Sequence, residues 1–398
     1  MRAPRPRTLG VLCVCLVLLA AGVYGGVRWM RGTQGSVTLL ASWSGEERAQ
    51  FEEHVIEPFE AKYRIDVVYQ GSSALSQVLA ADMAAGSPPD VAVLPGPGEL
   101  LAHAMDGRLH PLDQLFDTEQ YDRFWAPEIT VPGEEAHTYW LPVKTGLKSM
   151  VWYGGRTAPT ESVAPGRWCL GMESGATSGW PGTDWVEDIL LQQAGPRVYE
   201  DWANGKLAWT DKAVAKAWST WADMVAAGGG RPAEEALTTG FADACAPGRL
   251  EHQGSFRAGR WAGEGGFVHF SDVVPGAGPN AGAWEVSGDL AAVYHRTPEA
   301  EQLIRYLADP GTELPEYTAN RAAEPGGQDA TGGKIGEILR GSGRVRCWDA
   351  SDAMPRTTRD AFQQAVLRHL VAPDELGDLL RELDSLRVRQ DLPVCGSG

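Results

Sequence analysis

The chain has 398 residues, of which 43% are hydrophobic and 22% charged. This composition excludes an intrinsically disordered chain, and the length favours two domains over a single hydrophobic core. The formal net charge of −17 argues against a nucleic-acid partner, because binding phosphates requires clustered lysine and arginine.

Residues 1–32 have the pattern of an export signal. Three arginines precede residues 9–27, a run of 19 residues without a charged side chain. Such a run can span a bilayer, and the basic flank places its start on the cytoplasmic side. We expect either a cleaved signal peptide or an uncleaved N-terminal membrane anchor. Both place the rest of the chain at the extracellular face of the cell membrane, anchored or secreted.

The cysteines outside this segment are expected to form disulfides. Cys13 and Cys15 lie in the apolar run, which leaves four cysteines in the exported body. Export permits disulfides, and four cysteines allow three pairings. The sequence alone does not choose among them, and free buried thiols are the alternative. Our expected pairs are Cys169 with Cys245 and Cys347 with Cys395.

The residues after the linker at 32–35 predict an α/β unit. Apolar runs at 36–43, 65–71 and 91–94 predict strands, and residues 44–63 and 73–86 predict helices between them. The first helix opens with a capping box formed by Ser44 and Glu47. A βαβαβ order implies a parallel sheet, and ligands lie beyond the carboxyl ends of such strands. This rule indicates Trp43, residues 71–73 and residues 95–98.

The following residues predict a crossing into a second lobe. Residues 139–155 form two apolar runs broken by Lys144, Thr145 and Gly146. Beyond them we expect a strand at 167–175, a helix at 183–195 capped by Thr183 or Asp184, and a helix at 211–230. Residues 311–343 are rich in glycine, and we expect mostly loop there.

Five stretches together resemble one protein family, the extracellular solute-binding proteins of ABC importers (family 1), in particular the α-glucoside and oligosaccharide type. They are residues 41–60, 86–113, 168–205, 251–256 and 349–355. The resemblance implies an α/β, two-lobe periplasmic-binding-protein-like fold with hinge crossovers and a central ligand cleft. The lobes would be residues 33–148 plus 289–330 and residues 149–288 plus 331–398. It also implies a monomer that binds a sugar and docks on ABC importer permease subunits, without cofactor, metal or catalytic residue.

The stretch "SGWPGTDW" places two tryptophans and an aspartate around a turn, which suits a sugar. An aromatic ring can cover the apolar face of a pyranose, while carboxylates and lysines bind its hydroxyls. The candidate ligand-binding residues are Trp43, Ser72, Ser73, Lys144, Trp180, Asp184, Trp185, Phe256, Asp289 and Asp352. Each has a structural alternative: Trp185 as core, Lys144 as a solvated side chain, Asp289 and Asp352 as helix N-caps.

One departure from the subgroup bears on specificity. Its members usually carry an arginine-aspartate pair after the second strand, where this chain has Ser73 and Ala74. A changed sugar preference or weaker binding would follow from that loss.

Two other function classes are weighed against a receptor. A glycoside hydrolase needs two acids across the scissile bond, whereas Asp184 and Asp188 lie four residues apart on one helix, where a capping or solvated role is expected. A membrane-anchored sensory or scaffold protein would use the fold without transport, and an uncleaved N-terminal segment would favour it.

Overall fold

The computed structural model describes residues 34–160, 167–226, 231–243, 245–246, 248–324 and 329–397. The predicted export segment, with Cys13 and Cys15, lies outside these residues. Among the helices of the described part, none is long and apolar enough to cross a membrane.

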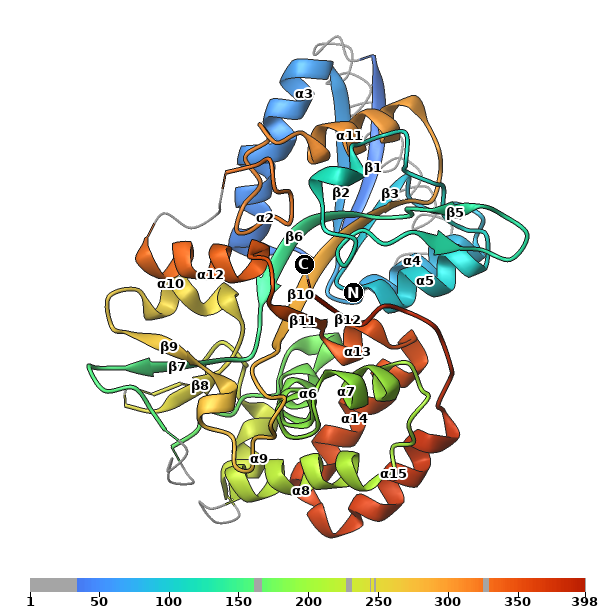
Figure 1. Cartoon of the computed structure of the whole chain (residues 1–398). Coiled ribbons are helices and arrows are strands. Elements are labelled where there is room, and N and C mark those ends of the chain that lie inside the picture. Colours follow the sequence, from blue (N-terminus) through green and yellow to red (C-terminus); the bar gives the residue numbers. More distant parts are fainter. Residues whose placement is uncertain are drawn as a thin grey trace, which may run out of the picture.

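A seven-stranded mixed sheet forms the upper part of the molecule in Figure 1. Six of its strands follow the order β12-β11-β10-β3-β1-β2. The seventh strand, β6, pairs with β10 outside this order. The strands are β1 (Gly35–Ala41), β2 (Ile65–Gly71), β3 (Val91–Leu94), β6 (Leu141–Leu147), β10 (Trp284–Val293), β11 (Val345–Trp348) and β12 (Cys395–Ser397). Both β2 and β3 run parallel to β1, so the predicted parallel unit is confirmed. The antiparallel pairing of β10 with β3 and β6 makes the whole sheet mixed.

Helices pack against this sheet on both sides. They are α2 (Gly45–Phe51), the π-helical turn η1 (Glu52–Ile56), α3 (Glu57–Tyr63), α4 (Leu75–Ala84), α5 (Pro97–Met105) and α11 (Pro298–Ala308). The expected apolar face of residues 44–63 is buried through Phe51, Val55 and Phe59. The predicted capping box is wrong. Ser44 is the N-cap of α2 but its hydroxyl caps no backbone N–H, and Glu47 pairs with Lys144 instead.

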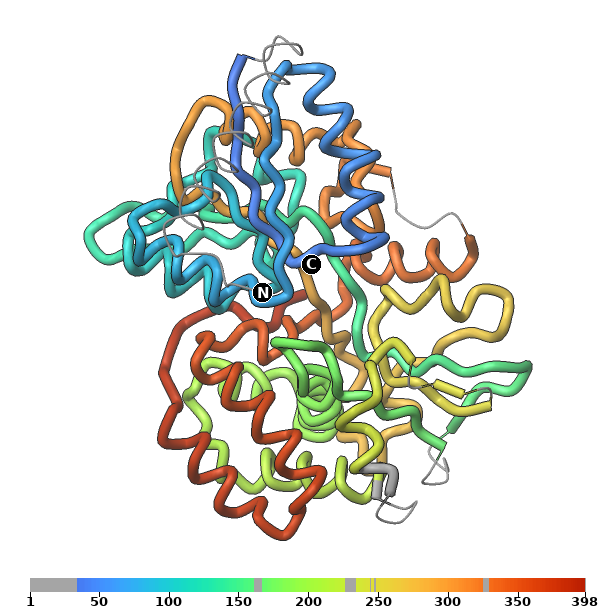
Figure 2. The backbone as a smooth tube through the Cα atoms, turned by 180° about the vertical axis from the view of Figure 1, so that it is seen from behind, coloured from blue at the N-terminus to red at the C-terminus, as the bar shows by residue number. Residues whose placement is uncertain are grey.

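The second lobe combines a three-stranded antiparallel sheet with a group of helices. The sheet has the order β8-β7-β9, with β7 (Met150–Gly154), β8 (Leu250–His252) and β9 (Gly265–His269). The helices are α6 (Trp180–Ala194), α7 (Pro196–Ala203), α8 (Lys212–Ala226), α9 (Arg231–Thr238), α10 (Ala258–Trp261), α13 (Ala350–Ala353), α14 (Arg356–Val371) and α15 (Leu376–Ser385). Helix α6 lies in the middle of this group and contacts α7, α8, α13 and α14, as Figures 1 and 2 show.

The remaining elements are short or connect the lobes. They are β4 (Ile129–Thr130), β5 (Ala136–His137), α12 (Ala330–Arg340) and the 3-10 turns η2 (Thr118–Gln120), η3 (Gly175–Thr177), η4 (Ser255–Arg257), η5 (Phe270–Asp272) and η6 (Pro373–Glu375).

Three expected elements differ from the structure. Residues 167–175 form no strand, because their β-pairing is limited to the isolated bridges Trp168–Leu250 and Glu173–Gly240. The helix expected from residue 183 begins at Trp180. The stretch 311–343 contains helix α12, whose apolar side is buried through Ile335, Ile338 and Leu339 at helical spacing. The glycines of this stretch favoured the expectation of a loop over that of a helix.

Both expected disulfides, Cys169–Cys245 and Cys347–Cys395, are present. The second joins β11 to its neighbour β12. These two strands extend the large sheet although they fall in the range expected for the C-terminal lobe. The lobe boundaries themselves stay a prediction.

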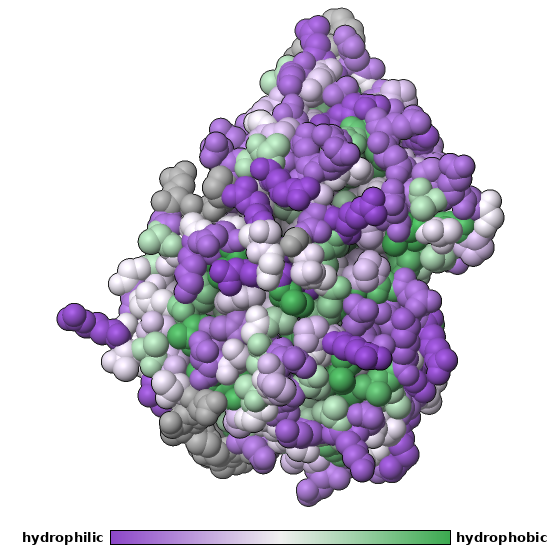
Figure 3. Space-filling view, in the orientation of Figure 1, coloured by the Kyte–Doolittle hydropathy of each residue, from purple (hydrophilic) through white to green (hydrophobic). Residues whose placement is uncertain are grey.

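Two segments cross between the lobes side by side. The chain passes from β6 into β7 through Lys148 and Ser149, and β10 pairs with β11 at one end and β3 at the other. Around them, the face of the molecule seen in Figure 3 is mostly hydrophilic, with small hydrophobic areas near the junction. This junction positions the site described next.

Candidate functional site

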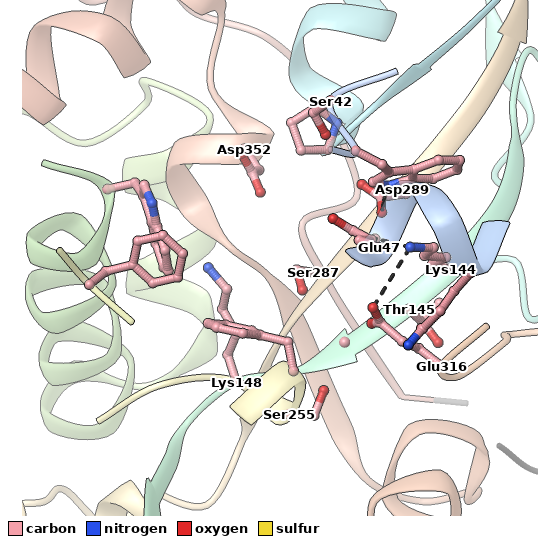
Figure 4. A pocket seen from close by; sticks show the side chains of 18 of the residues that line it. Ser42, Glu47, Lys144, Thr145, Lys148, Ser255, Ser287, Asp289, Glu316 and Asp352 are labelled. Atoms are coloured by element: carbon pink, nitrogen blue, oxygen red, sulfur yellow. Dashed lines mark hydrogen bonds and ion pairs between the residues drawn. The ribbon is translucent and has the colours of Figure 1, made fainter. Parts of the chain in front are cut away.

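A cleft of about 540 Å³ lies at the junction of the lobes (Figure 4). Its lining residues come from both lobes and from the crossover strands. They are Ser42, Trp43, Glu46, Glu47, Gln50, Pro95, Lys144, Thr145, Gly146, Lys148, Trp180, Phe241, Ser255, Phe256, Ser287, Gly288, Asp289, Glu316 and Asp352. A second hollow of about 780 Å³ beside Glu119, Arg123 and Arg321 has no accessible aromatic ring among its lining residues. The first cleft therefore suits an organic solute better.

One side of the cleft is organised around Lys144. Its ammonium lies 2.7 Å from a carboxylate oxygen of Glu47 and 3.7 Å from one of Glu316. The same ammonium lies 4.3 Å from the ring centroid of Trp43. The indole N–H of Trp43 donates a 2.9 Å hydrogen bond to Asp289. Lys144 thus pairs with two acids and lies over an indole ring that binds the third.

Two acids of this group, Asp289 and Glu316, have raised pKa values. Burial raises the pKa of Asp289 to about 6, although Lys144 and the indole of Trp43 oppose the rise. Burial likewise raises the pKa of Glu316 to about 7, against the pull of Lys144. Burial disfavours the charged form of Lys144, but attraction to Glu316, Asp289 and Glu47 outweighs it and raises the pKa of Lys144. Burial therefore disfavours the charged forms of Asp289 and Glu316, whereas the ammonium of Lys144 stays charged.

The opposite side of the cleft is aromatic. The ring of Trp180 packs against Phe241 at 5.1 Å and Phe256 at 6.1 Å between ring centroids. Trp180 is half-buried, and Phe256 is 46% exposed. Flat apolar surface is therefore accessible from the cleft, which is uncommon for such large rings unless something covers them.

The turn before α6 explains how Trp180 reaches this position. Gly179 is the N-cap of the helix with φ of 105°, a left-handed conformation that favours glycine. A Cβ at this position would lie 2.3 Å from the carbonyl oxygen of Gln363, so no other residue fits. Pro181, the second helical residue, has a fixed φ that suits the first turn. The turn therefore fixes Trp180 as the first helical residue at the cleft.

Lys148, which lines the cleft, binds two buried carboxylates that do not. Its ammonium lies 3.0 Å from Asp184 of α6 and also contacts Asp349, the N-cap of α13. Attraction to these acids outweighs burial and raises the pKa of Lys148. Burial alone would raise the pKa of Asp349, but Lys148 holds it at about 2. Burial raises the pKa of Asp184 to about 7 despite Lys148. The crossover segment is thereby fastened to two helices of the second lobe.

Two further buried acids, Glu187 and Glu285, lie near Lys148 and Asp349. Glu187 accepts hydrogen bonds from the backbone N–H groups of Ala350 and Ser351, at 2.6 and 3.2 Å. Glu285 is buried without a hydrogen-bond partner for either carboxylate oxygen in the described structure. Burial, then the negative charge of Glu187, raises its pKa well above the usual range. Burial therefore favours the neutral form of Glu285.

Three of these acids have the spacing of metal ligands. Carboxylate oxygens of Asp184, Glu285 and Asp349 lie within 4.8 Å of one another. The ammonium of Lys148 already contacts two of the three. Because a lysine supplies the positive charge that a metal would bring, we assign no metal to this cluster.

The structure places six of the ten predicted ligand residues in the cleft. They are Trp43, Lys144, Trp180, Phe256, Asp289 and Asp352. Asp289 lies within strand β10, and Asp352 within α13 behind the N-cap Asp349, so neither is a helix N-cap. Whether each contacts a ligand stays a prediction.

The other four do not line the cleft. Ser72 and Ser73 lie in the loop after β2, where the Ser72 hydroxyl accepts from the N–H of Ala74. Trp185 is buried against Trp168 and His252, which is its structural alternative. Asp184 lies behind Lys148.

The expected solvated or capping role of the α6 acids is wrong. Asp184 and Asp188 are buried, and Asp188 accepts from the hydroxyl of Ser149 and hydrogen-bonds His252. They form part of the internal packing because α6 passes through the middle of its lobe.

Several cleft residues were missed by sequence reasoning. Lys148 follows Lys144 by four residues in the predicted crossing, and this repeat was an available signal. Glu47 was assigned to a cap, and its side chain points to the cleft instead (Figure 4). Glu316 lies in a loop with φ of 68°, and nothing in its local sequence indicates a site.

Comparison with known proteins gives one family match. The bacterial extracellular solute-binding protein family matches residues 42–313. The osmoprotective compounds-binding protein GgtB of Synechocystis sp. is 30% identical over 365 residues, covering 80% of this chain and 84% of that protein. The α-glucosides-binding periplasmic protein AglE of Rhizobium meliloti is 29% identical over 372 residues, covering 80% of each.

Solved structures share the fold. The solute receptor AcbH, described as preferring β-D-galactopyranose exclusively, superimposes with a TM-score of 0.71 at 14% identity, over 88% of this chain and 98% of that one. A chitin oligosaccharide binding protein gives a TM-score of 0.68 at 16% identity, over 88% and 98%. These relatives and fold neighbours are solute-binding proteins rather than enzymes.

Proposed function

Because the chain belongs to the bacterial extracellular solute-binding protein family, we propose that it binds a sugar in the cleft and delivers it to an ABC importer. The observation that carries this proposal is the accessible aromatic surface of Trp180, Phe241 and Phe256, which lies opposite the charged group organised around Lys144 in the same cleft. A pyranose has one apolar face and a rim of hydroxyls, so it complements both sides.

In this account the sugar ring stacks on Trp180. Lys144, Asp289 and Asp352 bind its hydroxyls, and Asp184 acts through Lys148. Rotation of the lobes about the crossover segments then encloses the sugar. The closed form docks as a monomer on the permease at the extracellular face of the membrane, where residues 1–32 target or anchor it.

The finer substrate class is an α-glucoside or related oligosaccharide. Its support is the likeness to AglE, which binds α-glucosides by its name. The test is a binding titration with maltose, maltotriose, trehalose, sucrose and cello-oligosaccharides. Saturable binding of an α-linked sugar, with weaker binding of the β-linked series, is the expected result.

A further inference from the structure

The side chains lining the cleft carry more acids than bases. The acids are Glu46, Glu47, Asp289, Glu316 and Asp352, and the bases are Lys144 and Lys148. Among these described lining residues there is no arginine or histidine to add positive charge. A neutral sugar needs hydrogen-bond acceptors for its hydroxyls but no excess of negative charge, so this imbalance calls for an explanation.

Both lysines of the lining already pair with carboxylates of the protein. Lys144 faces Glu47 at 2.7 Å and Glu316 at 3.7 Å, with Asp289 also attracting it. The ammonium of Lys148 contacts the carboxylates of Asp184 and Asp349, which do not line the cleft. One ammonium among three carboxylates leaves a deficit of positive charge on that side.

Asp352 adds an acid that nothing in the described structure binds. Its backbone N–H donates to Asp349, which fixes it in the first turn of α13, and its own carboxyl makes no hydrogen bond or ion pair there. Figure 4 shows this carboxyl directed into the cleft, on the side away from Lys144. It is therefore available to a ligand.

The aromatic side suits a cation as well as a sugar face. The ammonium of Lys148 already lies 5.5 Å from the ring centroid of Trp180, and Phe256 is 46% exposed beside it. Positive charge near such rings is favourable, and more so as water is excluded.

We infer that the solute is an amino sugar, whose protonated amine lies among the cleft carboxylates while its ring stacks on Trp180. The inference rests on the proposed function and names the ligand class within it. The amine would bind Asp352, or the acids around Lys144, and would supply the positive charge that the lining lacks.

The experiment compares matched ligands on the full-length chain in detergent by isothermal titration calorimetry at pH 7. The ligands are maltose, 2-amino-2-deoxymaltose and its N-acetyl derivative, which is bulkier but neutral. The amine is expected to bind at least about tenfold more tightly than either neutral sugar. Its advantage should shrink as salt rises from low to high concentration, because part of it is Coulombic.

A second readout is proton release on binding. A bound cation favours the charged forms of Asp289, Glu316 and Asp352, whose pKa values burial raises. The charged groups facing the first two are Lys144 and Glu47, and those facing Asp352 are Asp349, Lys148, Arg359 and Asp184. The amine should therefore release protons, seen as a binding heat that depends on the buffer, and maltose should release fewer.

Variants locate the amine. Asp352→Asn is expected to lower the ratio of amine to maltose affinity at least about threefold, and Glu316→Gln provides the same test if that variant fails to fold. Asp374→Asn changes an exposed acid that does not line the cleft; it is the matched control and should leave the ratio unchanged.

The outcomes separate the two proposals. Equal or tighter binding of maltose would overturn the inference and leave the sugar-receptor proposal standing. An amine preference unaffected by both cleft variants would also overturn it. Binding of none of the three ligands, nor of the neutral sugar panel, would overturn both.

Discussion

The indole nitrogen of Trp43 donates a 2.9 Å hydrogen bond to the carboxylate of Asp289, 246 residues later in the chain. The bond joins the end of β1 to β10, a strand that pairs with β3, β6 and β11. Because Lys144 also lies over the ring of Trp43, one side of the cleft is a connected unit of charges and hydrogen bonds.

We predict that Trp43→Phe destabilises the protein more at pH 8 than at pH 5. The pKa of Asp289 is raised to about 6 even with the indole N–H favouring its charged form. Above that pH the variant must keep an ionised carboxylate without this donor, at a cost of about 1.5–3 kcal/mol. Denaturant unfolding at the two pH values measures the difference.

The matched control is Trp140→Phe. Trp140 is also buried, but its indole N–H donates to the carbonyl oxygen of Trp125, which does not titrate. Its loss of stability should be the same at both pH values. Equal pH dependence in the two variants would show that the Trp43 bond does not support the Asp289 charge.

Glu316→Gln should flatten the dependence of stability on pH. Burial raises the pKa of Glu316 to about 7, from an ordinary value of 4.5. The folded state then binds more protons than the unfolded state between those values, so the free energy of unfolding falls as pH rises through this window. Thermal unfolding from pH 4 to 8 should show a smaller fall in the variant. Glu313→Gln changes a nearby acid that does not line the cleft and should behave as wild type, and an unchanged fall in Glu316→Gln would contradict the assignment.

Lys148→Met should be strongly destabilising, by about 3–5 kcal/mol, because it leaves buried acids without their cation. Lys206→Met removes an exposed lysine that pairs with Asp391 at 2.7 Å, and should cost about 1 kcal/mol or less. Chemical unfolding at pH 7 compares the two. A similar loss of unfolding free energy in the two variants would mean that Lys148 does not stabilise the contact between the crossover segment and the helices α6 and α13.

Trp180→Ala should weaken sugar binding at least about tenfold, equivalent to about 1.4 kcal/mol, because the stacking surface is lost. Trp180→Phe keeps a flat ring beside Phe241 and should lose less. Fluorescence or calorimetric titration gives the affinities, and circular dichroism establishes that both variants fold. Full affinity in a folded Trp180→Ala variant would remove this residue from the site.

The sequence allowed the strands and helices of the first unit to be predicted, since their periodicity is local. Strand β2 occupies the residues expected for it, and both disulfides join the expected cysteines. Trp180 could be proposed because a glycine-proline turn beside tryptophan is unusual for a core segment. The helix α12 was missed because its glycines lower helix propensity, while its burial depends on tertiary contacts.

The site was harder to predict because its charges come from distant segments. Glu47, Lys144 and Glu316 are far apart in the sequence and come together only when the chain has folded. No local pattern links them. Asp184 and Trp185 belong to the recognised stretch, yet the helical turn directs them inward while Trp180 faces the cleft. The position of a residue within this stretch, and the helix face on which it lies, therefore decide whether its side chain lines the cleft.

The most direct test of the central claim is a tryptophan-fluorescence titration of the full-length chain in detergent with the sugar panel and the amino sugar. Trp43 and Trp180 line the cleft, so binding there should change the emission. We predict a saturable change with at least one sugar, and its loss or weakening in Trp180→Ala. No change with any of these ligands, in protein shown to be folded, would contradict the receptor account and favour an anchored sensory or scaffold protein.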